Sequence, residues 1–508
     1  MESLYWLLIA TISISLLIFK LLNYPHVIRK LPPGPSPWPL IGNLNLIGPL
    51  PHQSLHKLSQ TYGELMYLKF GSTPVVVASS PEMAKLLLRT HDHVFASRPS
   101  TAAGRLTHFN CRSVGFSPYG PYWIQGRKIY YNEVFSAKKL SFFEYIRVEE
   151  CKILRSRLHA LSGEPIMLKG HLSRCTLSVI SRMVLGRKYI SESEGEKEVV
   201  TFVEFREMLD EFFVLNGTLN IGDWIPWMQF MDLQGYVKRM KTLRKRLDRF
   251  LEHVLEDHRE RMRDEGDDFV VKDVVDSLLK MVDDPNLEVK IDFNDVKGLT
   301  QDLVAGGTET SALTVEWAMS ELIKQPHLIK KAIEELDIVI GTERWVEEND
   351  LPNLPFLDSI LKETMRLHPV AILPPHLSIQ DCKVAGYDIA KGTLIFTNSW
   401  SIGRDPNFWD DPESFRPERF FGRDIDVKGQ HFELLPFGSG RRMCPGYNFA
   451  LLMTSSLLAN MLQGFTWKLP KNMRCEDINM DEVYGLSTTR KFPLYIIPEP
   501  RLLGKMYH

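Results

Sequence analysis

Residues 437–446 read Phe-Gly-Ser-Gly-Arg-Arg-Met-Cys-Pro-Gly, and this segment constrains the fold more than any other part of the sequence. Gly438 and Gly440 can adopt backbone conformations closed to other residues, which favours a tight bulge that aims N–H groups at the sulfur of Cys444. The apolar run after Pro445 is typical of a helix that has the proline at its first position. We therefore predict a loop and a helix N-terminus built around one cysteine.

The surroundings of Cys444 suit an anionic metal ligand. The macrodipole at a helix N-terminus lowers the pKa of a thiol, so we expect the sulfur to be a thiolate. Arg442 supplies a permanent cation whose planar guanidinium matches a carboxylate, such as a cofactor propionate. A lone cysteine is by default a buried structural residue. The glycines, the arginine and the helix start at fixed offsets favour axial ligation of haem iron instead.

With these residues the chain resembles the cytochrome P450 family of haem-thiolate monooxygenases. The family's pattern Phe-x-x-Gly-x-Arg-x-Cys-x-Gly is met by Phe437, Gly440, Arg442, Cys444 and Gly446. The resemblance implies haem b with Cys444 as its axial ligand, and a mainly α-helical body with small β-sheets. It covers nearly the whole chain after a proline-rich N-terminal segment, and three further motifs follow the family's order.

A long helical pattern, from Phe293 to Leu322, contains two adjacent glycines, Gly306 and Gly307. Each costs about 1 kcal/mol in a helix interior, so they need a reason. The hydroxyl of Thr310 can bond to the carbonyl of Gly306, which bends a helix and opens a groove. The string resembles the family's oxygen-activation motif, which implies that Thr310 and Glu309 deliver protons during O2 activation. The alternative is a helix kink beside a surface acid.

Glu363 and Arg366 are three residues apart, so they share one face of a helix. They match the family's Glu-x-x-Arg motif, and residues 415–420 match the segment whose arginine, here Arg419, joins that pair. The resemblance implies a charge triad that braces the haem-side core. Alone, such a pair is usually a solvated ion pair worth roughly a few tenths of a kcal/mol.

Trp123 and Arg127 are four residues apart on one helical face. In the family this pair contacts a haem propionate, and an indole N–H and a guanidinium can both donate to it. The alternative is a core edge with a snorkelling cation. His376 stands where the family often has arginine. It can also donate to a propionate, but its charge would depend on the local pH.

The substrate pocket is placed only by position in the family. Its candidate residues are mainly apolar, which favours a hydrophobic ligand with few polar anchors, and each is as well explained by ordinary core packing. They are Phe109, Val114, Phe116, Phe213, Leu303, Ile372, Leu373, Leu486 and Thr488.

Composition argues against several classes of function. A formal net charge of −2 gives no concentrated basic face for nucleic acid. Six scattered cysteines form neither zinc-finger spacing nor a disulfide framework, which favours a reducing compartment. No dinucleotide fingerprint of the form Gly-x-Gly-x-x-Gly occurs, so electrons must come from another protein.

The N-terminal residues predict a membrane anchor. Leu4 to Phe19 are almost wholly apolar, near the lower length limit for crossing a bilayer. A cleaved signal peptide is the alternative, but the basic start and a small-residue cleavage site are missing. Lys20, Arg29 and Lys30 follow the apolar run, which places the body in the cytosol. We expect residues 1–22 to be a single-pass anchor, in the endoplasmic reticulum membrane by resemblance.

Six prolines between residues 25 and 39 favour a stiff extended connector. The string Leu-Pro-Pro-Gly-Pro at residues 31–35 resembles the proline hinge of microsomal members of the family. No Ser- or Gly-rich linker divides the chain after this point. We therefore expect a hinge over residues 23–43 and one haem-binding catalytic domain over residues 44–508.

Three further segments carry structural predictions. Leu65–Phe70 and Val75–Ala78 are typical of strands in a hairpin. The apolar spacing from Val237 to Leu255 predicts an amphipathic helix, whose basic residues we interpret as its solvated face. The aromatic stretch Ile221–Met231 is either core or a surface that dips into the lipid interface.

Together these observations predict a membrane-anchored monooxygenase that inserts one oxygen atom of O2 into a lipophilic small molecule. The motifs resemble plant enzymes related to flavonoid hydroxylases and terpenoid-modifying enzymes, which implies a terpenoid, flavonoid or phenylpropanoid substrate. By the same resemblance NADPH–cytochrome P450 reductase supplies the electrons, and Arg441 and Lys128 are candidates for docking it. The alternatives are an enzyme of C–C cleavage or rearrangement, a non-catalytic haem sensor or electron carrier, and a membrane-bound scaffold.

Overall fold

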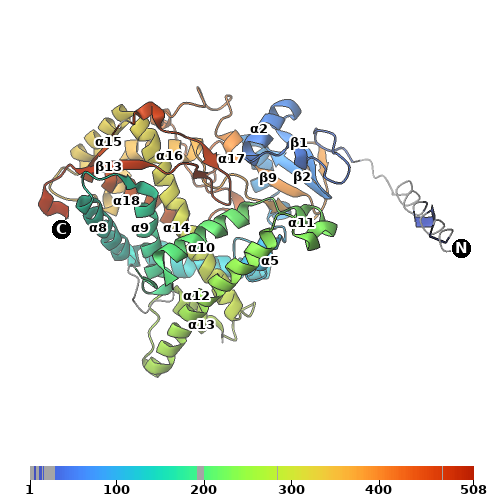
Figure 1. Cartoon of the computed structure of the whole chain (residues 1–508), viewed down its shortest axis with the longest axis horizontal. Helices are drawn as coiled ribbons and strands as arrows, with labels where there is room; N and C mark the ends of the chain where they lie inside the picture. Colours follow the sequence, from blue (N-terminus) through green and yellow to red (C-terminus); the bar gives the residue numbers. More distant parts are fainter. Residues whose placement is uncertain are drawn as a thin grey trace.

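The computed structural model describes residues 5–6, 11–13, 15, 29–191, 200–282, 284–471 and 473–507. The chain is mainly helical with small sheets, as predicted, and one sheet lies at the end of the molecule beside α2 (Figure 1). Within these ranges we find no helix with the length and apolar character needed to cross a bilayer. Most of the expected anchor, residues 1–22, lies outside the described residues.

The α-helices are α2 (Pro51–Tyr62), α3 (Pro81–Lys85), α4 (Asp92–Phe95), α5 (Ala102–Thr107), α6 (Pro121–Tyr130), α7 (Ala137–Phe142), α8 (Glu144–Ala160), α9 (Leu168–Leu185), α10 (Phe202–Gly217), α11 (Ile221–Trp224), α12 (Tyr236–Glu265), α13 (Val274–Val282), α14 (Phe293–Lys324), α15 (Pro326–Val339), α16 (Pro355–Leu367), α17 (Ser399–Ile402) and α18 (Tyr447–Gly464). The strands are β1 (Leu65–Phe70), β2 (Thr73–Ala78), β3 (Ile166–Met167), β4 (Ile190–Ser191), β5 (Val200–Thr201), β6 (His376–Leu377), β7 (Cys382–Val384), β8 (Tyr387–Ile389), β9 (Leu394–Thr397), β10 (Phe465–Lys468), β11 (Glu482–Val483), β12 (Thr489–Arg490) and β13 (Tyr495–Pro500).

Helix α14 is the central element of the helical body. It begins with a reciprocal capping box between Asp292 and Asp295, and it runs two residues beyond the predicted end. It packs against α9, α16 and α18, so most of its length is buried. At Gly307 an added Cβ would lie 2.7 Å from Cδ1 of Ile180 on α9. A glycine is therefore needed there for the close approach of the two helices.

The largest sheet places one of the expected site residues. Its strand order is β1-β2-β9-β6. β1 and β2 form the predicted antiparallel hairpin, in which Leu65 pairs with Ala78. β9 runs parallel to β2, and β6 pairs with β9 in the antiparallel sense. His376 is the first residue of β6, so the sheet carries it toward the helical body.

The proline-rich segment packs along β1. From residue 29 to 37 it forms neither helix nor strand, in keeping with the predicted extended connector. The N–H of Tyr67 donates to the carbonyl of Pro33 at 2.8 Å, and the Asn43 amide donates to the carbonyl of Pro35 at 3.3 Å. These bonds hold the segment against the sheet. Proline has no backbone N–H to donate, but its carbonyl oxygen can still accept a hydrogen bond.

The aromatic stretch from residue 221 to 231 is divided between core and surface. It forms α11 and the 3-10 helix η4 (Pro226–Met231). Trp224 packs into the core of the large sheet, whereas Trp227 and Phe230 are 59% and 84% exposed. Neither of the two predicted alternatives therefore describes the whole stretch.

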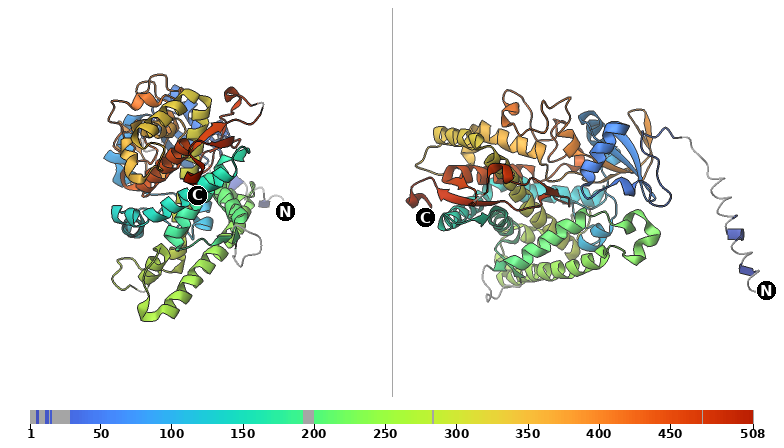
Figure 2. Two further views of the ribbon diagram at one scale, coloured as in Figure 1. Left: turned by 90° about the vertical axis from the view of Figure 1, so that its left-hand side faces the viewer. Right: turned by 45° about the horizontal axis from the view of Figure 1, so that its top comes forward.

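Helix α12 is ten residues longer at its C-terminus than predicted. Glu256 pairs with Arg259 at 3.0 Å and with Arg263 at 2.9 Å across the added turns. Apolar spacing cannot reveal turns stabilised by such pairs. In the right-hand view of Figure 2, α12 lies along the edge of the molecule with α10 beside it.

The two adjacent glycines of α14 should respond differently to substitution. Gly307→Ala forces a methyl group into Ile180, so we expect the free energy of unfolding to fall by about 1–3 kcal/mol. A Cβ added at Gly306 would meet no other atom within 4 Å, and Gly306→Ala should leave stability unchanged or raise it by up to about 1 kcal/mol. Urea unfolding of both variants measures the difference, and equal stabilities would contradict the close packing of α9 on α14.

Candidate active site

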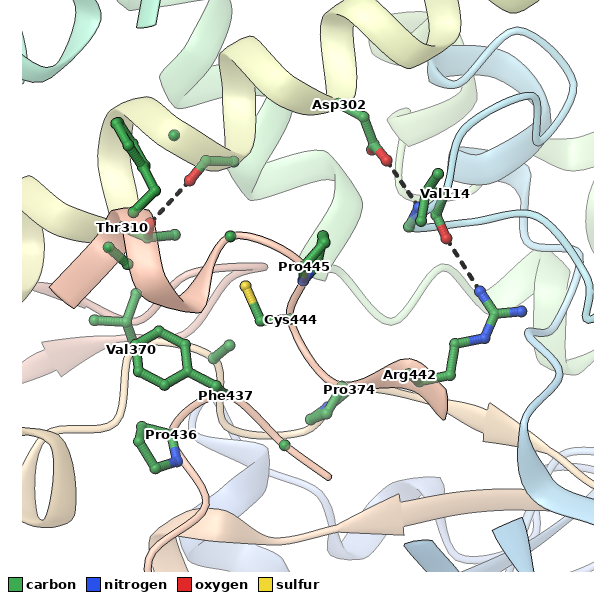
Figure 3. Close-up of a pocket in the computed structure, with 18 of the residues that line it drawn as sticks. Val114, Asp302, Thr310, Val370, Pro374, Pro436, Phe437, Arg442, Cys444 and Pro445 are labelled. Carbon is green, nitrogen blue, oxygen red and sulfur yellow. Dashed lines mark hydrogen bonds between the residues drawn. The ribbon is translucent and has the colours of Figure 1, made fainter. Parts of the chain in front are cut away.

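A cavity of about 380 Å³ lies between α14 and the loop that carries Cys444. Its α14 wall includes Leu303, Gly306 and Thr310. Val370, Ala371, Pro374 and His376 close one side. The Cys444 sulfur points from its loop toward the α14 face that carries Thr310 (Figure 3). The cavity thus brings together the cysteine loop and the glycine-threonine helix, which are far apart in the sequence.

The loop around Cys444 has the predicted tight geometry. Gly438 and Gly440 have φ values of 69° and 67°, in the left-handed region. A Cβ at Gly440 would lie 2.1 Å from the carbonyl oxygen of Leu88, so no other residue fits. The Cys444 N–H donates to the carbonyl of Phe437 at 2.9 Å, which closes the loop.

Two details of the cysteine environment differ from the prediction. Helix α18 begins at Tyr447 with Gly446 as its N-cap, so Pro445 precedes the helix instead of opening it. Burial raises the pKa of the Cys444 thiol, although the Gly446 N–H and the charge of Arg127 act in the opposite direction. The predicted lowering of this pKa is therefore wrong for the protein alone, because the loss of water outweighs the helix end. A bound metal ion would supply the missing positive charge.

Three arginines line the same cavity without a carboxylate partner. Within the described residues, Arg98, Arg127 and Arg442 form no ion pair within 4.0 Å. Burial, followed by the charges of Arg98 and Arg127, lowers the pKa of Arg442 to about 8. Burial also lowers the pKa of Arg98 to about 10. Partly buried cations that lie this close together without an acidic partner favour an anion between them.

The hydrogen-bond donors of the cavity suit carboxylates. Arg442 donates to the carbonyl of Val114 at 3.1 Å (Figure 3). Its guanidinium also lies over the ring of Trp123, 4.5 Å from the ring centroid. Arg127 donates to the carbonyl of Met443 at 2.8 Å. The Trp123 Nε1–H is buried and has no hydrogen-bond partner among the described residues. The cation cluster and this orphaned donor fit the propionates of haem, and the cavity-facing sulfur fits an axial ligand.

His376 lines the cavity in a state that limits its part in this cluster. Its Nδ1 lies 2.9 Å from the carbonyl of Phe95. Burial, with the nearby charge of Arg98, holds the pKa of His376 well below its usual range, so the ring is neutral. A neutral ring that donates Nδ1–H to Phe95 leaves Nε2 as an acceptor. The expected donation to a propionate therefore requires a protonated ring.

The glycine-threonine segment of α14 has the predicted hydrogen bond but separates its two polar residues. The Thr310 hydroxyl donates to the carbonyl of Gly306 at 2.8 Å and faces the cavity. Glu309 is buried outside the cavity lining, where its carboxylate lies 3.1 Å from Nζ of Lys169 on α9. Neighbouring positions on a helix are about 100° apart, so the two side chains face different neighbours.

Lys169 keeps its charge beside Glu309. Burial lowers the pKa of Lys169, but the carboxylates of Glu309 and Asp210 more than offset this and the net shift is upward. Asp210 lies 3.6 Å from the same ammonium group, and its side chain is half exposed. The Glu309 carboxylate is therefore held in a buried ion pair that reaches toward solvent.

The structure brings the three members of the expected charge triad together. Arg366 donates to Glu363 at 2.7 and 2.8 Å, and Arg419 donates to the same carboxylate at 2.9 Å. All three side chains are buried. Arg366 also donates to the carbonyls of Pro412 and Ser414, at 2.7 and 3.1 Å. The triad thereby ties the chain that precedes the cysteine loop to α16.

Two of the expected pocket residues, Val114 and Leu303, line the cavity. The others lie outside its lining and take part in other contacts. Phe109 lies under Arg244, and Phe116 stacks on a buried histidine. The remaining five pack in the core or near the turn between β11 and β12: Phe213, Ile372, Leu373, Leu486 and Thr488.

Sequence reasoning missed two charged residues of the cavity lining, Arg98 and Asp302. Burial raises the pKa of Asp302 to about 6, while its carboxylate accepts from the N–H of Gly115 at 2.8 Å. Asp302 precedes Gly306 and Thr310 by four and eight residues, a spacing that puts it on the same helical face. Arg98 follows no motif, and the sequence carried no signal for it.

Comparisons with known proteins agree on one family. The family model described as Cytochrome P450 matches residues 32–495. Trimethyltridecatetraene synthase of Zea mays is 44% identical, covering 98% of this chain and 94% of that protein. Flavonoid 3'-monooxygenase of Petunia hybrida is 41% identical, covering 94% and 93%. A solved zebrafish cytochrome P450 with abiraterone, 26% identical, superposes with a TM-score of 0.73 over 89% of this chain and 100% of that one.

Removing the shared acid of the triad should destabilise the fold strongly. Glu363→Gln leaves two buried guanidinium groups without a carboxylate, so we expect a loss of about 3–5 kcal/mol in the free energy of unfolding. Asp358→Asn on the same helix removes an exposed pair with Lys362 and should cost less than about 1 kcal/mol. Urea unfolding measures both, and a Glu363→Gln variant as stable as Asp358→Asn would contradict the bracing role.

The orphaned indole N–H should help to retain haem. Trp123→Phe keeps a ring beneath Arg442 but removes the donor, so haem transfer to excess apomyoglobin should become about tenfold faster. Trp345→Phe is the matched control, because its indole N–H donates to the carbonyl of Met506 away from the cavity. An unchanged rate for Trp123→Phe would show that this N–H does not contact the cofactor.

Proposed function

The chain belongs to the cytochrome P450 family and is a monooxygenase, and from this premise we propose that it hydroxylates a lipophilic plant metabolite of the terpenoid, flavonoid or phenylpropanoid class. The observation that carries the proposal is the cavity between Cys444 and the Thr310 face of α14. Apart from Asp302 and the cation cluster, its walls are largely apolar or backbone, so a hydrophobic molecule fits it better than a charged one.

The cavity residues divide the work between holding the cofactor and serving the reaction. When bound, haem supplies the oxidative chemistry with O2. Cys444 would hold the haem iron through its sulfur, and Arg98, Arg127 and Arg442 would neutralise the propionates. Apolar side chains such as Leu303 keep water away from the reacting part of the substrate.

Thr310 is the residue that we assign to proton transfer in the cavity. A hydroxyl has one donor and two acceptor positions, so Thr310 can donate to the carbonyl of Gly306 and still accept a hydrogen bond from a water molecule in the cavity. Glu309 remains a proposed proton source behind it. Because its carboxylate is paired with Lys169 outside the cavity lining, that pair must open before Glu309 can serve.

Electrons come from a partner in this proposal, NADPH–cytochrome P450 reductase on the same membrane. Lys128 is exposed on α6, one residue after Arg127 of the cavity wall. Arg441 is bonded to Asp92 at 2.7 Å, which partly neutralises it. Lys128 is therefore the stronger of the two expected docking residues.

The proposed setting is the endoplasmic reticulum membrane, with residues 1–22 as the anchor, 23–43 as the hinge and 44–508 as the cytosolic catalytic domain. Two exposed apolar segments support a membrane contact: one carries Trp38 and Leu40, and the other Trp227 and Phe230. Both border the β1–β2 turn, since Gly42 bridges Phe70 and the N–H of Ser72 donates to the carbonyl of Trp224. Apolar surface concentrated in this way suits a lipid interface.

A second candidate reaction is C–C bond cleavage. One relative at 44% identity is named for the synthesis of an unsaturated hydrocarbon, a product without oxygen. One way for a monooxygenase to form such a product is to break a carbon–carbon bond of an oxygenated substrate, so that the oxygen leaves with the other fragment. Product mass distinguishes the two candidates, because hydroxylation adds one oxygen atom and cleavage gives a shorter hydrocarbon.

The function is tested with membranes that contain the protein, reductase and NADPH, incubated with a plant metabolite extract under ¹⁸O2. We expect a product that carries one labelled oxygen atom.

The reduced, CO-treated protein should show the red-shifted Soret band of thiolate ligation, and Cys444→Ser should abolish it. A band that persists in Cys444→Ser would overturn the ligand assignment. Oxygen uptake without any product would favour a sensor or electron carrier.

Thr310→Ala should uncouple oxygen use from product formation. Without the hydroxyl the cavity loses its proton-transfer group, so a larger share of NADPH, by about tenfold, should end as hydrogen peroxide. Thr308→Val is the matched control, because Thr308 is buried away from the cavity and bonds to the carbonyl of Val304. Full coupling in Thr310→Ala would sink the relay assignment.

A further inference from the structure

Four basic residues form one row along the outer face of α12: Lys238, Lys241, Lys245 and Arg249. Their spacing of three, four and four residues keeps them within one narrow arc of the helix over about 16 Å. All four are exposed, and in the right-hand view of Figure 2 this helix lies at the edge of the molecule. We call these four residues the cationic stripe.

The stripe differs from the other basic residues of α12 in having no counter-charge. Arg239 is paired with Glu211 at 2.6 Å, Arg246 lies 3.8 Å from Glu207, and Arg244 covers the Phe109 ring at 3.4 Å. For the members of the stripe, no ion pair within 4.0 Å exists in the part of the chain that the structure describes. Acidic residues enter this face only after Arg249, and the first of them, Glu252, is paired with Lys297 and Arg259.

Nearby acidic groups are committed elsewhere. Asp248, the one acid between residues 236 and 250, is bonded to Lys297 on α14 at 2.8 Å. Glu204 feels the charge of Arg249, but its lowered pKa is due first to a hydrogen bond from the Thr201 N–H, where it completes the capping box of α10. Four like charges one turn apart repel one another, so an anionic partner is favoured.

The stripe is continuous with exposed apolar surface. η4 lies just before α12 in the chain. Phe230 and Met231 of η4 are 84% and 48% exposed, and Leu233, between η4 and α12, is 57% exposed. Asp232 joins the two features, since its carboxylate accepts from the N–H groups of Val237 and Lys238 at 3.0 and 2.9 Å. The apolar side chains and the first cation are thus held in a fixed relation.

We propose that the cationic stripe binds the headgroups of anionic phospholipids while the apolar side chains of residues 227–233 enter the lipid interface. This inference rests on the membrane association proposed above and adds a preference for lipid charge. Apolar and cationic side chains in sequence match the boundary between acyl chains and headgroups. An acidic protein would be attracted to the charges but would gain less from the exposed aromatic and methionine side chains, so a bilayer fits the surface better.

Lipid charge then sets how the body lies on the membrane. α12 packs against α5 and α10, and Arg244 within it covers the loop that contains Val114 of the cavity wall. A headgroup contact along the stripe therefore holds α12, the helix that covers this side of the cavity, against the membrane surface. A neutral bilayer offers only the apolar part of the contact.

The test uses the full-chain haem-loaded protein and preformed vesicles of phosphatidylcholine, with or without about 30% phosphatidylserine. We expect the vesicle partition coefficient to rise about tenfold with phosphatidylserine at low salt, and this increment to vanish as salt is raised to about 0.5 M. The fourfold variant Lys238→Ala, Lys241→Ala, Lys245→Ala and Arg249→Ala should reduce the increment to twofold or less. Binding to phosphatidylcholine alone should be unchanged.

Two further variants make the result specific. Lys238→Arg, Lys241→Arg and Lys245→Arg together keep the charge and should keep the increment. A control that replaces four exposed lysines on other elements with alanine, Lys152, Lys391, Lys471 and Lys505, removes equal charge and should also keep it.

An increment that survives in the fourfold alanine variant, or that the control loses equally, overturns the proposal. Unchanged partition together with a raised KM for the reductase in the fourfold variant also overturns it, in favour of an acidic protein partner. The CO-bound Soret band and product formation in detergent are read separately, so failure of the proposed monooxygenase function is distinguishable from failure of the lipid contact.

Discussion

The structure depends on keeping a partly buried cluster of cations and a partly buried sulfur beside one cavity. Arg442 and Arg127 bond to backbone carbonyls of two distant loops, so the cluster also joins those loops. Burial and the charges of Arg98 and Arg127 lower the pKa of Arg442, and no carboxylate of the described chain forms an ion pair with these arginines. The protein therefore carries an unbalanced positive charge at its centre, and a cofactor with two carboxylates and a metal ion balances both the cluster and the Cys444 sulfur.

Helix α14 sets the other wall, and its composition follows from what each face meets. Gly307 allows α9 to pack closely, while Gly306 and Thr310 open a polar notch onto the cavity. Glu309 faces α9 and is neutralised by Lys169. The same few turns thus serve packing, charge balance and the proposed proton transfer, which accounts for helix-weakening glycines in a buried helix.

The outer surface extends this picture from the cavity to the surroundings of the protein. Exposed apolar segments that are distant in sequence meet at the β1–β2 turn. The cationic stripe follows one of them directly along α12. A hydrophobic substrate partitions into membranes, so a body that rests its apolar edge on the bilayer has short access to such a molecule. Substrate class and surface chemistry therefore point the same way.

The sequence by itself determined the features that depend on local spacing. Cys444 in its glycine loop, the Thr310 bond to Gly306, and the Glu363–Arg366 pair each rest on fixed offsets within one loop or one helix. The hairpin and the long central helix followed from periodicity for the same reason. Only the tertiary structure decided that Arg98 joins the cluster, that Glu309 faces away from the cavity, and that most expected pocket residues pack elsewhere. Those outcomes depend on which distant segment each side chain meets, and helical period specifies a face but not its neighbour.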